Sequence, residues 1–93
     1  MSLPQAFLEG FDDLSRAFSN VRWAVTGGAA LVMMGLDRTT HDVDCIVDQS
    51  RAGLLSILQP RDGWTFTQNT REDYVSFFYG DRVLFEFFPC KFT

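Results

Sequence analysis

The spacing of apolar residues predicts helices and strands that alternate along the first half of the chain. Residues 3–19 carry apolar side chains at helical spacing and acidic side chains opposite them, which predicts an amphipathic helix. Residues 29–35 are apolar nearly all round and predict a short buried helix. Two strands are expected on either side of that helix, over residues 21–26 and 42–48.

The second half begins with one more helix and ends in strands. Asp48 or Ser50 is placed to cap a helix that stops before Pro60. Three further strands are expected, over residues 64–68, 74–79 and 82–88. The last two are rich in aromatic residues and are joined by Gly80-Asp81, a hairpin turn of the Gly-X type. We expect those aromatic side chains to lie mainly in the core, with a dimer contact as the weaker alternative.

The resulting order of elements, α-β-α-β-α-β-β-β, predicts an α+β fold. In this fold a mixed sheet of four to five strands has helices packed on it. The chain has 93 residues, of which 46% are hydrophobic, and this is enough for one domain with a single core over residues 1–93.

Composition and charge exclude several classes of protein. The net charge of −4 argues against a general nucleic-acid-binding surface. We see no signal peptide and no apolar stretch long enough to span a membrane. Neither Cys45 nor Cys90 belongs to a CxxC pair, so we expect reduced, mostly buried thiols and a cytoplasmic location. The single histidine argues against a His-based zinc site.

Asp42 and Asp44 lie one residue apart at the start of an expected strand. Because successive strand residues alternate between faces, both carboxylates project from the same face. Neighbouring carboxylates repel each other, and a bound cation is the usual reason to keep them together. Magnesium is the hard cation that suits such oxygen ligands. The alternative is a pair of solvated aspartates at a surface position.

Glu86 is the candidate third carboxylate, because it is the only charged residue within 83–88. A lone acid in an aromatic strand is costly unless it is paired or bound to a cation, although a solvent-facing position on an edge strand is the alternative. A shared metal site requires its carboxylate within about 6 Å of those of Asp42 and Asp44. Upstream, the Gly27-Gly28 pair either lets the backbone approach a phosphate or only shapes a tight turn.

These residues together resemble a known family. The segment Val25-Thr26-Gly27-Gly28, thirteen residues, and then Asp42-Val43-Asp44-Cys45 are similar to the signature of the DNA-polymerase-β-like nucleotidyltransferase superfamily. The loop over residues 35–42 resembles the minimal branch of that superfamily, which includes the bacterial abortive-infection toxin nucleotidyltransferases. The resemblance covers residues 21–48 well and extends more loosely through the third carboxylate.

The resemblance implies a metal-dependent catalytic site. Asp42 and Asp44 would bind two Mg²⁺ (or Mn²⁺) ions that also hold the triphosphate of a nucleotide. Glu86 would join one metal and help to deprotonate the acceptor hydroxyl.

The resemblance also implies a nucleotide-binding set around the glycine pair. Thr26, Gly27 and Gly28 would bring the backbone to the β- and γ-phosphates. Arg38 could reach a phosphate with the N–H groups of its guanidinium, or it could be a solvated loop residue.

The implied reaction is in-line attack on the α-phosphorus of an NTP, with release of pyrophosphate. The acceptor would be a protein side chain, a tRNA end or a small alcohol such as an aminoglycoside. The sequence departs from the family in two respects: it carries Glu86 where Asp is usual, and no helical segment follows that strand. We therefore keep open a fragment truncated at its C-terminus, a small member that needs a partner chain or homodimer, and an inactive nucleotide-binding or protein-interaction module.

Overall fold

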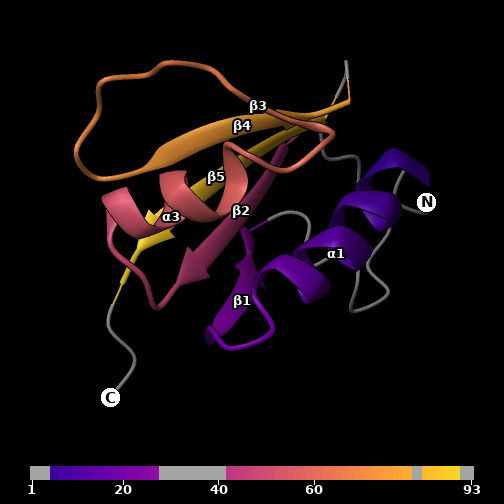
Figure 1. Ribbon diagram of the computed structural model, residues 1–93, viewed down its shortest axis with the longest axis horizontal. Coiled ribbons are helices and arrows are strands. Elements are labelled where there is room, and N and C mark those ends of the chain that lie inside the picture. The colour runs from indigo at the N-terminus through magenta and orange to yellow at the C-terminus, as the bar shows by residue number, and fades with distance from the viewer. Residues whose placement is uncertain (1–4, 28–41, 81–82, 91–93) are drawn as a thin grey trace.

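The computed structural model describes residues 5–27, 42–80 and 83–90, which form a small α+β domain with two helices and an open, mixed sheet of five strands (Figure 1). The elements in chain order are α1 (Gln5–Ala17), β1 (Trp23–Thr26), β2 (Asp42–Val47), α3 (Arg51–Leu58), β3 (Trp64–Phe66), β4 (Val75–Tyr79) and β5 (Val83–Pro89). The expected helix over residues 29–35 lies outside the described residues, and the other expected elements are confirmed within a few residues. The largest difference is β3, which ends at Phe66 because Gln68 leaves the extended conformation with a φ of 63°.

The strand order of the sheet is β1-β2-β5-β4-β3, so the last of the described strands lies at its centre. The β2–β5 pair is parallel, and the other three pairs are antiparallel. In the parallel pair Asp44 lies beside Glu86 and Asp42 beside Leu84. Two segments that are far apart in the sequence are thereby placed next to each other.

The two faces of the sheet differ because side chains alternate along each strand. On the inner face, Val43, Cys45, Phe85 and Phe87 are fully buried, and they join the buried residues of both helices in one core. Figure 1 shows α1 and α3 on the same side of the sheet, where they cover this inner face. None of the described helices covers the outer face, to which Glu86 belongs.

Helix α1 packs unusually close to the sheet. A Cβ atom added at Gly10 would lie 2.6 Å from the ring of Phe85. The helix is also tied to the turn before β3, because the Asp13 carboxylate accepts hydrogen bonds from Nε and Nη2 of Arg61 and from the indole N–H of Trp64. These bonds, first of all those from Arg61, lower the pKa of Asp13. Helix α3 begins at a Ser50 N-cap, one of the two expected caps.

The prediction for the cysteines is correct for Cys45 and wrong for Cys90. Cys45 alternates onto the helix-covered face of β2 and is fully buried, and burial raises the pKa of its thiol to about 12. Cys90 follows the end of β5, beyond the strand positions that the helices cover, and is exposed. No helix among the described residues is long and apolar enough to cross a membrane, and the cytoplasmic location stays a prediction.

The aromatic residues of β4 and β5 divide between core and surface. Phe77, Phe85 and Phe87 are fully buried, so the expectation of a core role holds for them. Phe78 points to the outer face and keeps 39% of its surface exposed.

Candidate metal centre

The sheet brings the three predicted carboxylates together on its outer face. Asp42 and Asp44 project from the same side of β2, and the parallel register places Glu86 of β5 directly beside Asp44. One carboxylate oxygen from each of the three residues lies within 4.8 Å of the others. This distance meets the condition of about 6 Å that a shared metal site requires. We call these three residues the carboxylate cluster.

Proximity within the cluster makes it hard to ionise completely. Partial burial, then the charge of Asp44, and hydrogen bonds to both aspartates raise the pKa of Glu86 to about 7. The pKa of Asp44 is also raised, mainly by partial burial and then by the charge of Asp42. A hydrogen bond with Glu86 acts in the opposite direction and lowers it. The raised pKa means that the Glu86 carboxyl keeps its proton to a higher pH than an ordinary glutamate does. A bound divalent cation would replace that proton.

The donor set of the cluster fits a hard cation. Three carboxylates supply only oxygen ligands, which Mg²⁺ and Mn²⁺ prefer. Asp42 is exposed while Asp44 and Glu86 are partly buried, so the cluster is accessible from solvent on one side. This leaves room for water and for substrate oxygens to complete an octahedral shell.

The end of β1 lies against the cluster. Thr26 pairs with Asp44 in the β1–β2 register, and its hydroxyl donates to the Asp44 backbone carbonyl at 3.4 Å. Gly27 has a φ of 68°, and a Cβ atom there would lie 3.1 Å from Oδ2 of Asp44. Glycine is thus favoured here both by the left-handed backbone and by the close carboxylate. Gly28 and Arg38, the other residues expected to bind nucleotide, lie outside the described part of the chain.

The structure adds two neighbours of the cluster that the sequence did not indicate. Ser76 of β4 lies opposite Glu86, is nearly buried, and shares a hydrogen bond of 2.6 Å with the Thr67 hydroxyl. Tyr74 packs its ring against Phe88, two residues beyond Glu86 on β5. The alternation of β4 places Ser76 on the outer face. The expected two-residue Gly80-Asp81 turn would pair Tyr79 with residue 82 and Val75 with Glu86, and this prediction is wrong: Tyr79 pairs with Val83, which puts Ser76 beside the acid.

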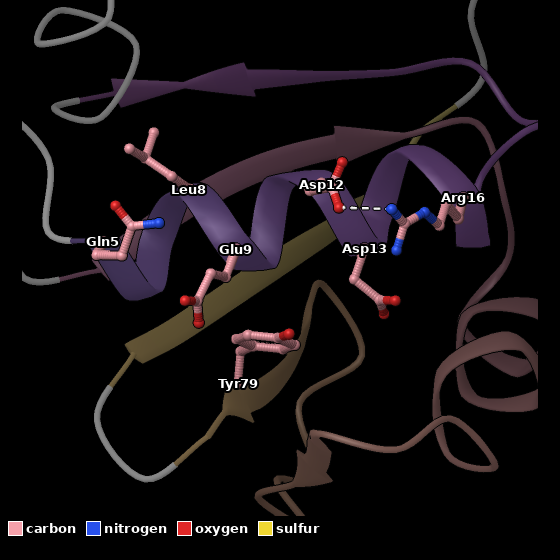
Figure 2. Close-up of a pocket in the computed structure, with 7 residues that line it drawn as sticks. All are labelled: Gln5, Leu8, Glu9, Asp12, Asp13, Arg16 and Tyr79. Atoms are coloured by element: carbon pink, nitrogen blue, oxygen red, sulfur yellow. Dashed lines mark ion pairs between the residues drawn. The ribbon is translucent and has the colours of Figure 1, made fainter.

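A pocket beside α1 lies apart from the cluster. Its volume is about 360 Å³, and Figure 2 shows its lining residues Gln5, Leu8, Glu9, Asp12, Asp13, Arg16 and Tyr79. Asp12 is paired with Arg16 at 2.9 Å, and Asp13 is paired with Arg61. Since most of its acidic side chains are already matched by arginines, this pocket does not present a second metal site.

Fold and site together define a small α+β domain whose sheet carries a cluster of three acidic residues able to hold a metal ion. Comparisons of the chain with protein-family models, with curated proteins and with solved structures gave no match. The functional assignment therefore depends on the residues and the geometry described above.

Proposed function

We propose that this chain is a metal-dependent nucleotidyltransferase, and that its sheet is a nucleotidyltransferase core. The observation that supports this most directly is the carboxylate cluster, with its ligand atoms within 4.8 Å of one another on the face of the sheet that neither α1 nor α3 covers. The proposal draws further support from Gly27, which lies close to the Asp44 carboxylate at the end of β1.

In the proposed reaction the cluster holds Mg²⁺ or Mn²⁺ and positions the triphosphate of an NTP. A cation held by Asp42, Asp44 and Glu86 would neutralise charge on the phosphates and would help to activate the acceptor hydroxyl. Asp42 and Asp44 would hold the cation that positions the α-phosphate, and the Gly27 backbone would leave space for the β- and γ-phosphates. The acceptor oxygen forms a bond to the α-phosphorus while the bond from that phosphorus to the leaving pyrophosphate breaks.

Glu86 is placed to receive the proton that the acceptor hydroxyl loses. In this proposal its carboxylate acts as the general base from within the cluster. The acceptor class is a hydroxyl compound: a protein side chain, a tRNA end or a small alcohol.

The test is incubation of the chain with labelled NTPs and Mg²⁺ across these acceptors, together with calorimetry of nucleotide binding. We expect labelled product from the wild type and none from the double variant Asp42→Asn/Asp44→Asn. The variant Asp12→Asn, which removes an exposed carboxylate on α1, is the matched control and should keep full activity. Labelling that persists in the double variant would overturn the assigned roles. Binding of nucleotide without turnover would favour the inactive nucleotide-binding module, and absence of binding would contradict both.

A further inference from the structure

An aromatic pair lies next to the carboxylate cluster on the outer face of the sheet. Phe88 is two residues beyond Glu86 on β5 and therefore shares its face. Because Val75 pairs with Phe87, Tyr74 lies opposite Phe88 at the start of β4. The two ring centroids are 5.5 Å apart with planes inclined by 34°, and both side chains are partly exposed. We call Tyr74 and Phe88 the aromatic pair.

The loop before β4 holds this pair in place. Arg51 of α3 donates to the backbone carbonyls of Asn69, Arg71 and Tyr74 at 2.7 to 3.1 Å. The side-chain amide of Asn69 donates to the same Tyr74 carbonyl at 3.1 Å. The Arg71 guanidinium lies 5.2 Å from the centroid of the Tyr74 ring. Tyr74 is therefore positioned by several polar contacts before any ligand arrives, which lowers the ordering cost of binding.

The sheet order separates the two sides of the cluster. Gly27 lies on the β1 side of Asp44, whereas the aromatic pair lies on the side of β5 and β4. Two residues along a strand span about 6.7 Å, so the Cα atoms of Glu86 and Phe88 are separated by about this distance. A ribose can fit within this span. A nucleotide whose phosphates lie toward Gly27, with its α-phosphate at the cluster, would extend its base toward Phe88.

We propose that the aromatic pair is the subsite for the nucleobase of the NTP, which stacks on the Phe88 and Tyr74 rings. This inference rests on the proposed function, since it takes the α-phosphate to lie at the carboxylate cluster. Stacking uses the π-face that every base has, so this subsite accepts any of the four bases. The net charge of −4 favours a single nucleotide held through its metal over a polynucleotide.

The experiment compares two probes, Mg²⁺-ATP and Mg²⁺-tripolyphosphate, in calorimetric titrations of three proteins. In the wild type we expect ATP to bind about tenfold more tightly than tripolyphosphate, because only ATP carries a base that can stack. In Phe88→Leu, which keeps an apolar side chain and loses the ring, that advantage should disappear while tripolyphosphate affinity is unchanged. Phe78→Leu is the matched control, since it removes an exposed ring from the same face. In Phe78→Leu the ratio of ATP affinity to tripolyphosphate affinity should equal that of the wild type.

The outcomes separate the two proposals. If tripolyphosphate binds but ATP binds no more tightly, or if Phe88→Leu keeps the advantage, the base subsite is wrong and the metal site stands. If neither probe binds the wild type, both proposals are wrong. Unchanged tripolyphosphate affinity in Phe88→Leu also reports that the variant is folded. If that variant does not fold, Tyr74→Leu tests the same subsite with the same two probes.

Discussion

Replacing Glu86 by glutamine removes the most perturbed carboxyl of the cluster and should change how stability depends on pH. The pKa of Glu86 is raised from 4.5 to about 7 in the folded chain, by partial burial and by the neighbouring aspartates. The folded state therefore binds a proton that the unfolded state releases between these two pH values. The contribution of Glu86 to the free energy of unfolding is fully present below pH 4.5 and is lost as the pH rises through about 7.

The size of this effect follows from the difference in pKa. It corresponds to at most about 3 kcal/mol, and partial exposure to solvent reduces the expected value to about 2 kcal/mol. Since glutamine does not titrate, the free energy of unfolding of Glu86→Gln relative to wild type should rise by about 2 kcal/mol between pH 5 and pH 8.

Urea unfolding at pH 5, 6, 7 and 8 in EDTA measures this difference directly. Glu9→Gln, which removes an exposed carboxyl on α1, is the control for the loss of a negative charge far from the cluster. A difference between Glu86→Gln and wild type that does not change with pH would refute the reasoning, as would a difference that falls as the pH rises. Added Mg²⁺ should stabilise the wild type at pH 8 and have a smaller effect on the glutamine variant, because a ligand is missing.

Three further variants or measurements test the packing and the site. Gly10→Ala should lower the free energy of unfolding by about 1 to 3 kcal/mol, because the alanine Cβ would overlap the Phe85 ring and this outweighs the better helix propensity of alanine. Thermal unfolding measures this effect, and stabilisation by the substitution would contradict the close approach of α1 to the sheet. Gly27→Ala should cost about 1 to 2 kcal/mol because of its positive φ, and calorimetry should show weaker Mg²⁺ binding. In thiol labelling followed by mass spectrometry, exposed Cys90 should react quickly and buried Cys45 only after unfolding; equal rates would show that β2 is not protected.

The carboxylate cluster could be predicted from the sequence to the extent that it depends on local alternation. The period of two in a strand is enough to put Asp42 and Asp44 on one face, and the hydrophobic run around Glu86 is enough to mark that acid as unusual. What brings Glu86 to Asp44 is the parallel register of β2 and β5, two strands with no local link. No pattern in a single sequence specifies such a register.

Side-chain environment was harder to predict than secondary structure. By helix propensity alone Gly10 is only a small destabilising residue in α1, but in the structure it is the point at which α1 meets the Phe85 ring. Cys90 was expected to be mostly buried because cysteine usually is, yet it lies beyond the covered part of β5. Both outcomes depend on which elements lie above a residue in three dimensions, and composition does not report that.

The central position of β5 has a consequence for synthesis on the ribosome. A nascent chain that has not yet released residues 83–90 contains Asp42 and Asp44, but it lacks both Glu86 and the strand that joins β2 to β4. The two halves of the sheet cannot unite until that strand arrives, and the third ligand arrives with it. Under the proposed function, full Mg²⁺ affinity would therefore be acquired only when the whole sheet has assembled, because the incomplete chain lacks one carboxylate of the cluster.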